Sequence, residues 1–574
     1  MRNSTVKTYD VVVVGSGAGG LSAAVTAAYH GLSVAVLEKA DVLGGATSWS
    51  GGWAWTPRTS FAKKDGVHDS KDDVKTYIKA VTGEYYQEDN VDAFLEAAPH
   101  MVDFFQKKTD LQFTPGAQIK DIYGDLPGAG TGHRSVGPTP FNARKVPKEL
   151  RKKLRHQLYE TSFLGMGIMA GQDLRAFLAA SQLEPRGLIH AARRVLTHIW
   201  DELIHGRNMQ LVNGTALTAR LALSAHKLGV ELLTEHTALS LIQDDNEDRV
   251  VGVRAQTDDG IVEFRAEKGV VLATGGFPHN IELRKQLFPR TPTGQEHYTL
   301  APESATGDGL SMAQAVGAAF ETDLKSPAAW CPVSQVPYFN GKVGVFPHIM
   351  DRAKPGSMGV ISTGERFVNE ANGYYDYVDG MIAASPEGEP VQAWQIADST
   401  FVRKYPLGMA KPFPIPLFPY VRNGYLERAR SLEQLARKAG IDPEGLKRSV
   451  EKHNAFAAQG EDPEFGRGSS EFNRYGGDPK VGPNPSLAPI VKAPFYAVKI
   501  LPGSFGTFAG IKADESARVL REDGSVIDGL YTAGNDRASI MGGFYPSGGI
   551  NLGPALAFGY VIGRNLAGAK DWEV

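Results

Sequence analysis

The stretch from residue 11 to residue 39 restricts the fold of this chain more than any other. Val11–Val14 form a short β-branched apolar run, which is typical of a strand buried on both faces of a parallel sheet. Gly15–Gly20 read GSGAGG, an Ala-rich segment follows, and Glu38 closes a second apolar run. Strand, glycine turn, helix, strand and acid in this order predict a dinucleotide-binding βαβ unit.

The three glycines of the GxGxxG spacing have separate tasks. Gly15 permits a tight turn, Gly17 lets the backbone approach a pyrophosphate, and Gly20 lets the helix pack close to the strand. The N-terminus of the helix then points at the phosphate site, and the carboxylate of Glu38 can accept a hydrogen bond from a ribose hydroxyl. A glycine turn in some other α/β protein is the alternative interpretation.

Size and composition limit the class of protein. A chain of 574 residues is too long for one compact core and suggests two domains. Its net charge of -3 gives no global attraction to nucleic acid or to an anionic membrane. Cys331 is the only cysteine, which excludes an internal disulfide and a cysteine-held metal. A cytoplasmic location is therefore expected.

Neither a signal peptide nor a membrane-spanning segment is expected. The first predicted strand begins about ten residues from the start, which leaves no room for a signal peptide. The longest uncharged stretch, residues 538–563, is interrupted by Pro546, Pro554 and several glycines. These residues argue against a transmembrane helix there.

Two later segments indicate that the dinucleotide is FAD. Ala273–Gly276 (ATGG) ends one buried strand, and Gly529–Asp536 (GLYTAGND) ends another. An FAD-binding fold needs such strand ends for the ribitol and the flavin, whereas a nicotinamide dehydrogenase needs neither. Asp536 is a candidate for the ribityl or pyrophosphate region, with turn capping as the alternative. The helix after Gly549 can direct its N-terminus at the isoalloxazine.

The residues expected to contact FAD share these glycine-rich turns and strand ends. They are Gly15, Ser16, Gly17, Ala18, Gly19, Gly20, Glu38, Lys39, Gly44, Gly45, Ala46, Thr47, Ser48, Gly51, Gly52, Ala273, Thr274, Gly275, Gly276, Asn535, Asp536, Gly549, Ile550 and Leu552.

The chain divides into three parts in this interpretation. Residues 1–285 form the first part of the FAD-binding domain, with a helical subdomain over about 70–205. Clustered prolines and frequent aromatics mark residues 286–487 as an inserted catalytic domain, and residues 488–574 complete the FAD-binding domain. We therefore expect an α/β fold: a Rossmann-like FAD-binding domain of the glutathione-reductase type with an inserted α+β domain.

One charged segment stands apart from this plan. Arg144–Arg155 carries seven basic residues and one acidic residue. A solvated helical face is the first interpretation, and an anionic partner or a weak membrane-surface contact is the alternative.

Nearly the full length of the chain resembles the flavoproteins that include fumarate reductases and 3-ketosteroid Δ1-dehydrogenases. The resemblance rests on GSGAGG with Glu38, GGATSWSGG, ATGG, TGDGLSMAQAVGAA (Thr306–Ala319), GERFVNE (Gly364–Glu370) and GLYTAGND. It implies an FAD-dependent oxidoreductase that acts on CH–CH groups.

Two segments separate the branches of this family. Fumarate reductases have a proton-donating arginine just after the NE pair and a C-terminal segment similar to GGxHGxNRLGG. Here the NE pair is followed by ANGYYDYVDGM, and YPSGG (Tyr545–Gly549) is similar to the YPGxG of ketosteroid dehydrogenases. The resemblance implies that Tyr545 and the N–H of Gly549 hold the substrate ketone. It also implies that Tyr374 is the base, with Tyr375 and Tyr377 as alternatives.

The family's third tyrosine, which assists the base, is displaced. Aligned on Pro127–Gly128, the loop DIYGDLPG places Ile122 at that position and Tyr123 one residue later. This departure puts the proton relay in doubt and suggests a substrate other than a steroid, because the loop would border the pocket.

The implied reaction is the α,β-desaturation of a cyclic ketone, either a 3-ketosteroid or a cyclohexanone-type ring. A phenol and a backbone N–H stabilise the enolate, a base takes the α-proton, and the β-hydrogen leaves as hydride to flavin N5. No histidine lies at Ser48–Ser50, so FAD is expected to bind non-covalently. The sequence does not identify the electron acceptor.

Two other functions stay open. One is a fumarate-reductase-like or enoate reductase, for which Arg134 or Arg537 would have to hold the substrate carboxylate. The other is a non-catalytic flavoprotein that contacts RNA, protein or a membrane through Arg144–Arg155, although the mild overall charge argues against RNA.

Overall fold

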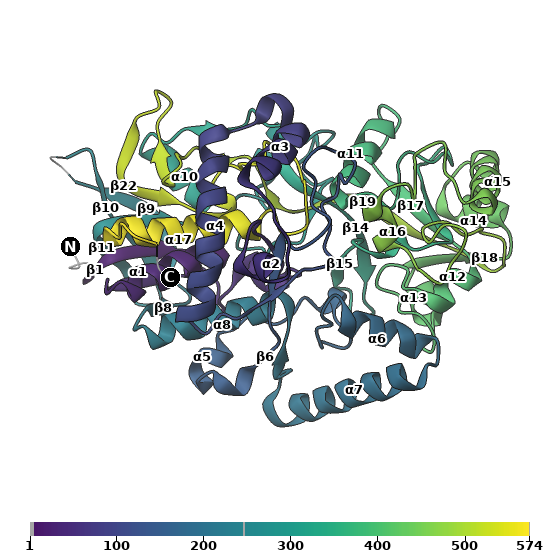
Figure 1. The fold of residues 1–574 in the computed structure, drawn as a ribbon, viewed down its shortest axis with the longest axis horizontal. Helices are drawn as coiled ribbons and strands as arrows, with labels where there is room; N and C mark the ends of the chain where they lie inside the picture. Colours follow the sequence, from purple (N-terminus) through teal and green to yellow (C-terminus); the bar gives the residue numbers. More distant parts are fainter. Residues whose placement is uncertain (1–4, 245–246, 573–574) are drawn as a thin grey trace.

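A computed structural model describes residues 5–244 and 247–572 and shows two sheets joined side by side (Figure 1). The strands are β1 (Thr5–Val14), β2 (Val34–Leu37), β3 (Ala54–Trp55), β4 (Phe113–Pro115), β5 (Ser135–Pro138), β6 (Phe141–Asn142), β7 (Gln210–Leu211), β8 (Glu231–Leu233), β9 (Thr237–Gln243), β10 (Val250–Thr257), β11 (Gly260–Leu272), β12 (Tyr298–Thr299), β13 (Phe320–Glu321), β14 (Ala328–Pro337), β15 (Val343–Pro347), β16 (Ser357–Val360), β17 (Ala393–Ala397), β18 (Leu426–Ala429), β19 (Phe495–Thr507), β20 (Gly510–Ile511), β21 (Arg518–Leu520) and β22 (Val526–Thr532).

The helices connect and cover these strands. They are α1 (Ala18–Tyr29), α2 (Ser60–Lys64), α3 (Lys71–Thr82), α4 (Glu88–Lys108), α5 (Lys148–Lys152), α6 (Gln172–Ser181), α7 (Pro185–His205), α8 (Asn213–Lys227), α9 (Ile281–Leu287), α10 (Asp308–Ala315), α11 (Tyr374–Ala384), α12 (Ser399–Lys404), α13 (Phe418–Arg422), α14 (Leu432–Ala439), α15 (Pro443–Gln459), α16 (Glu471–Gly476) and α17 (Leu552–Ala567).

The first sheet is the α/β unit that the sequence predicts. Its strand order is β21-β22-β11-β1-β2-β8, with β10 and β9 attached beside β11. β1 runs parallel to β2 and to β11, and β11 runs parallel to β22. In this register Val14 pairs with Leu37 and with Leu272, and Leu272 pairs with Thr532. Four strands therefore end at one edge, which is where open α/β sheets bind ligands.

Small residues let two helices approach each other on this sheet. α1 packs against α17, and a Cβ placed on Gly559 of α17 would lie 2.4 Å from the carbonyl oxygen of Gly19 in α1. α17 also contacts the long helix α4, and the three helices lie close together in Figure 1. This close packing brings the C-terminal segment back to the first βαβ unit.

The second sheet belongs to the inserted domain. Its order is β15-β14-β19-β17-β16, and β12 and β18 also pair with the central strand β19. The boundary expected at residue 488 places β19 in the FAD-binding domain, but its hydrogen bonds place Phe495–Thr507 in the inserted sheet. The divisions 1–285, 286–487 and 488–574 otherwise stay a prediction. Among the described residues, no helix is both long enough and apolar enough to cross a membrane.

Candidate active site

The predicted glycine turn after β1 packs directly against the end of the neighbouring strand β11. Gly15 has φ +105°, and a Cβ on it would lie 2.1 Å from the carbonyl oxygen of Ala273. A Cβ on Gly20 would lie 2.1 Å from the carbonyl oxygen of Gly15. Both positions therefore require glycine, the first for its backbone angle and both for the close approach.

Other glycines at the same edge border open space. A Cβ on Gly45 or Gly534 would meet nothing within 4 Å, and one on Gly275 would meet only Ala305, at 3.8 Å. The first turn of α1 also leaves amide groups without helical partners at this edge. Open space beside backbone, at the N-terminus of a helix, fits the pyrophosphate part of FAD.

Hydrogen bonds hold the predicted cofactor segments together. The Glu38 carboxylate accepts hydrogen bonds from the amide of Ser16 at 3.1 Å, from its hydroxyl at 2.5 Å, and from the amide of Ala40 at 2.9 Å. Thr47 Oγ1 accepts from the amide of Ala18, at 2.9 Å, and so caps α1. Lys39 Nζ lies 2.9 Å from Asp308 Oδ2. Glu38 thus orders the turn, and its role toward a ribose stays a prediction.

Asp536 joins two strand ends. Its carboxylate accepts hydrogen bonds from the Thr274 amide, from Thr274 Oγ1 at 2.8 Å, and from the Gly276 amide at 2.8 Å. Burial raises the pKa of this carboxyl, against the lowering effect of those donors. The side chain therefore fastens the ATGG turn, and a contact between Asp536 and the cofactor stays a prediction.

A tyrosine pair joins the start of α11 to the YPSGG segment. The ring centroids of Tyr374 and Tyr545 are 4.8 Å apart with an interplanar angle of 75°. The Phe505 ring of β19 contacts Tyr374 at 5.2 Å, and Phe508 contacts Tyr545 at 6.2 Å. Burial raises the pKa of both phenols above their ordinary value. Residues far apart in the chain thus build one apolar, titratable site.

The other two tyrosines of the YYDY segment point elsewhere. Tyr375 shares a hydrogen bond of 2.7 Å with Ser326, and the ring of Tyr377 packs against Phe367 with a centroid distance of 5.0 Å. Tyr374 is the first residue of α11, and successive helix residues turn by about 100°. The start of the helix therefore decides which phenol faces Tyr545.

Tyr123 reaches α11 at a different residue. Its hydroxyl donates to Asp376 Oδ1 at 2.7 Å. Burial raises the pKa of Asp376 to about 6. The neighbouring Ile122 donates its amide to the carbonyl oxygen of Pro546, at 3.0 Å, and so ties the loop to the YPSGG segment. The structure gives no contact between Tyr123 and the tyrosine pair, and a relay function for Tyr123 stays a prediction.

Position 549 requires glycine because its backbone lies against strand β3 and the residue before it. It has φ +100°, and a Cβ on it would lie 2.6 Å from the carbonyl oxygen of Trp53. Its own carbonyl oxygen accepts from the Trp55 amide at 2.9 Å. A small hollow beside it is lined by Phe508, Asn535 and Ile550, among others. Two residues predicted to contact the cofactor, Asn535 and Ile550, therefore border the same space.

The two arginines considered for a carboxylate substrate are already engaged. Arg134 pairs with Asp69 at 2.6 Å and with Asp121 at 2.7 Å. Arg537 donates to Asn90 Oδ1 at 2.7 Å, and its guanidinium carbon lies 3.7 Å from the centre of the Phe558 ring. Arg134 is therefore not available as the clamp that a fumarate-type acid needs, whereas Nη1 of Arg537 is buried without a hydrogen-bond partner among the described residues.

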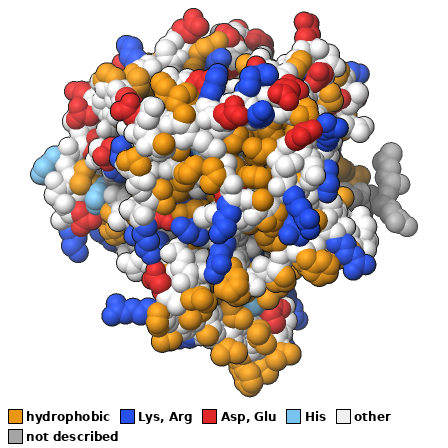
Figure 2. All heavy atoms as spheres, turned by 90° about the vertical axis from the view of Figure 1, so that its right-hand side faces the viewer, with side chains coloured by type: hydrophobic (Ala, Val, Ile, Leu, Met, Phe, Trp, Pro, Cys, Tyr) orange, Lys and Arg blue, Asp and Glu red, His pale blue; other side chains and the backbone are white. Residues whose placement is uncertain are grey.

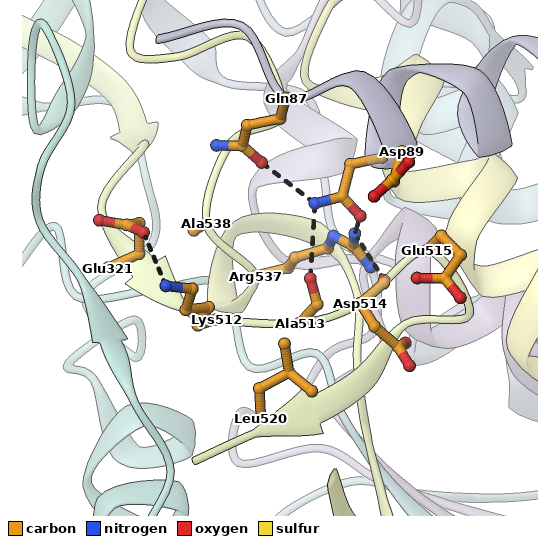
Figure 3. Close-up of a pocket in the computed structure, with 11 residues that line it drawn as sticks. Gln87, Asp89, Glu321, Lys512, Ala513, Asp514, Glu515, Leu520, Arg537 and Ala538 are labelled. Atoms are coloured by element: carbon orange, nitrogen blue, oxygen red, sulfur yellow. Dashed lines mark hydrogen bonds and ion pairs between the residues drawn. The ribbon is translucent and has the colours of Figure 1, made fainter. Parts of the chain in front are cut away.

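Arg537 instead forms part of a polar surface pocket of about 380 Å³ (Figure 3). Asp89, Glu321, Asp514 and Glu515 outnumber Lys512 and Arg537 among its charged side chains. The pocket contains neither Tyr374 nor Tyr545, so it is separate from the tyrosine pair.

Two residues of the site were missed by sequence reasoning. Asp376 lies within YYDY, two residues after Tyr374, and its place beside a candidate base was a usable signal. Phe505 lies in no motif, and only the pairing of β19 in the inserted sheet brings it to Tyr374.

A comparison with known protein families defines the class. The sequence profile for "FAD binding domain" matches residues 10–552, and the two-sheet fold with its glycine-lined edge is that of an FAD-binding flavoprotein. The chain is 38% identical to a 4-oxocyclohex-2-ene-1-carboxylate 5-dehydrogenase of Sinomonas cyclohexanicum, covering 99% of this chain and 95% of that protein. It is 36% identical to a 3-oxosteroid 1-dehydrogenase of Mycolicibacterium smegmatis, covering 98% of each.

A solved structure agrees with these relatives. The 3-ketosteroid Δ1-dehydrogenase of Sterolibacterium denitrificans, in complex with 1,4-androstadiene-3,17-dione, superposes with a TM-score of 0.90 at 35% identity, covering 98% of this chain and 100% of that one. The chain belongs to the 3-ketosteroid Δ1-dehydrogenase-like FAD flavoproteins. It is an FAD-dependent oxidoreductase that acts on CH–CH groups.

Proposed function

We propose that the protein desaturates a cyclic ketone between its α and β carbons, with non-covalent FAD as the oxidant. The observation that carries the proposal is the contact between Tyr374 of the inserted domain and Tyr545 of the YPSGG segment. The relatives named above act on ketones of two sizes, oxosteroids and an oxocyclohexene carboxylate, and we include both in the substrate class.

The ketone oxygen is held by Tyr545 and Gly549 in this proposal. The phenol O–H and the backbone N–H both donate to that oxygen and stabilise the negative charge that develops when the α-proton leaves. Burial helps, because hydrogen bonds to a developing charge are stronger where water is excluded. It also keeps Tyr545 protonated, since its pKa is raised well above neutrality.

Tyr374 is the proposed base for the α-proton. Its ring contacts that of Tyr545, so a ketone held by Tyr545 would lie close to the Tyr374 phenol. Because burial raises the pKa of Tyr374, the phenolate is scarce at neutral pH and strongly basic once formed. FAD, when bound at the glycine-lined edge, supplies the acceptor for the β-hydrogen as hydride.

The surroundings of Tyr374 favour a hydrocarbon ring over a charged acid. Tyr374 packs against an apolar cluster, and the guanidinium of nearby Arg352 is occupied by backbone carbonyl oxygens. The other residues of this cluster are Leu158, Tyr298, Leu300, Cys331, Val333, Val345, Leu501 and Phe505.

The test is anaerobic mixing of the oxidised flavoprotein with a panel of ketones and acids. We expect saturated cyclic ketones to bleach the flavin absorbance, with 3-ketosteroids and 4-oxocyclohexanecarboxylate in separate arms to define ring size. Bleaching should be lost in Tyr545→Phe. If no ketone bleaches the flavin while fumarate-type acids rapidly reoxidise the reduced protein, the proposal is wrong. Acid precipitation should release free flavin if FAD is non-covalent.

A further inference from the structure

The two ends of the basic segment Arg144–Arg155 contact different parts of the molecule. Arg144 pairs with Asp201 of α7 at 2.6 Å. Figure 2 shows exposed apolar side chains on the projecting lobe at its bottom, where Figure 1 places α6 and α7. At the other end of the segment, Leu154 forms a parallel β-bridge with Leu43. The segment therefore ends against the loop that follows β2, where the sequence predicts contacts to FAD.

Hydrogen bonds connect this bridge to the glycine turn. The Leu43 amide donates to the carbonyl oxygen of Lys153 at 2.6 Å, and the Arg155 amide donates to the carbonyl oxygen of Leu43 at 3.2 Å. The next residue of the loop, Gly44, donates its amide to Ser16 Oγ at 2.9 Å. Because Ser16 lies in the GSGAGG turn, these bonds fix the backbone of Arg155 beside the predicted cofactor edge.

The Arg155 side chain lies over an aromatic ring and leaves donors unused. Its guanidinium carbon is 5.3 Å from the centre of the Trp49 ring, and Trp49 Nε1 donates to the carbonyl oxygen of His156 at 3.2 Å. Among the described residues, Nε of Arg155 is buried without a hydrogen-bond partner. A buried donor without an acceptor is destabilising. The position therefore fits a ligand that supplies acceptor atoms.

Two nearby carboxylates indicate which part of FAD this ligand atom belongs to. Burial lowers the pKa of Arg155, and the carboxylates of Glu38 and Asp41 act in the opposite direction. Glu38 accepts hydrogen bonds from the amides of Ser16 and Ala40. Glu38 is also the acid expected at the adenosine ribose. The part of FAD expected beside Arg155 is therefore the AMP half and not the flavin.

The other two arginines of the segment have acceptors in the protein. Arg144 pairs with Asp201, and Nη1 of Arg151 donates to the carbonyl oxygen of Ala143 at 3.4 Å. Within residues 5–244 and 247–572, Arg155 is thus the arginine of this segment whose Nε lacks a protein acceptor. This end of the segment is neither a solvated face nor a surface patch for a partner.

We propose that Arg155 binds the AMP half of FAD, where its guanidinium supplies the donors that complement the Glu38 carboxylate at the ribose. A ribose hydroxyl can donate to a carboxylate and accept from a guanidinium at the same time, so one hydroxyl satisfies both side chains. The proposal depends on FAD binding and not on the ketone reaction proposed above.

The experiment titrates the flavin-free, full-length protein with FAD and with FMN, which lacks the AMP half, and follows flavin fluorescence. We expect Arg155→Gln to raise the dissociation constant of FAD by about tenfold or more, because one charge-assisted hydrogen bond is lost. The dissociation constant of FMN should stay unchanged. Arg155→Lys keeps the charge but not the planar fork of donors, so it should recover part of the loss.

Arg151→Gln is the matched control. It removes the same charge from the same segment, but the Arg151 side chain donates to Ala143 and not toward the loop after β2, so FAD affinity should stay at the parent value. Denaturant unfolding of flavin-free Arg155→Gln should match that of the flavin-free parent. If Arg155→Gln does not fold, Arg155→Lys takes its place in both titrations.

Three results would overturn the proposal. Arg155→Gln binds FAD as tightly as the parent, or it weakens FMN as much as FAD, which assigns Arg155 to the flavin half or to the shape of the loop. In the third, flavin-free Arg155→Gln loses as much unfolding free energy as it loses in FAD binding, which makes Arg155 a structural partner of Glu38 and Asp41.

Discussion

The cofactor edge is formed mainly by backbone atoms, whereas the tyrosine pair is formed by side chains. At the edge of the first sheet, backbone atoms do most of the work: Gly15 and Gly20 are fixed by contacts of 2.1 Å that a Cβ could not avoid. At the domain junction, the work falls to side chains, above all the phenols of Tyr374 and Tyr545. Changes at the edge should therefore alter folding and flavin content, and changes at the junction should alter rate alone.

The largest effect is expected from Gly15→Ala. Its Cβ would meet the Ala273 carbonyl oxygen at a positive φ, so we expect a loss of several kcal/mol of stability and no bound flavin. Flavin absorbance and thermal unfolding of the purified protein measure this. Gly31→Ala is the matched control, since Gly31 also has a positive φ but a Cβ there meets nothing within 4 Å. If Gly15→Ala is purified with bound flavin, the expected difference between the cofactor edge and the tyrosine pair is wrong.

Tyr545→Phe should show the opposite behaviour. Removing one donor to a developing oxyanion costs about 3 kcal/mol of barrier, so kcat/KM should fall by about 10²–10³-fold with flavin content unchanged. Steady-state kinetics with the best ketone of the panel measures the fall. Tyr375→Phe, whose hydroxyl bonds Ser326 instead, should keep most of the activity. If Tyr545→Phe loses its flavin, Tyr545 contributes to cofactor binding and the prediction is wrong.

The pH dependence tests Tyr374 as the base. Its pKa lies above the ordinary value near 10 because of burial, so the phenolate fraction rises about tenfold per pH unit throughout the range below it. The kcat/KM of the wild type should rise with pH up to at least about pH 10. In Tyr374→Phe this limb should disappear. A limb that persists in the variant would assign the base to another group.

The smallest effect is expected from Tyr123→Phe. The hydroxyl of Tyr123 donates to Asp376 and not to the tyrosine pair, so kcat/KM should fall by less than about fivefold. Stability should fall by about 1–2 kcal/mol, because a buried carboxylate oxygen loses its donor. Denaturant unfolding and kinetics measure the two quantities. A fall of 10²-fold or more would make Tyr123 part of the proton path.

The two regions also differ in how far the sequence predicts them. The edge follows from residue spacing, since Gly15, Glu38 and Ala273 each follow a strand and parallel strands end together. The choice of Tyr374 over Tyr375 and Tyr377 needs the start of α11, and residue spacing alone does not fix that register.

The orientation of the surface helix α7 also could not be predicted from residue spacing. Periodicity groups the apolar residues of a helix but does not state which face meets the protein, and α7 turns that face outward because Arg194 and Asp201 have partners in the body. The solvated helical face expected for Arg144–Arg155 is only partly right, because Arg144 and Lys145 belong to a 3-10 helix, α5 takes up Lys148–Lys152, and the remaining residues are not helical.

The two ends of the segment 277–506 lie next to each other. A Cβ on Gly276 would lie 2.1 Å from Thr507 Oγ1. Adjacent ends are what make a segment transferable between proteins. We therefore expect that residues 277–506 can be exchanged as one unit with those of a relative when their contacts to the flavin-binding part, such as Lys39–Asp308 and the pairing of β13 with β20, are kept.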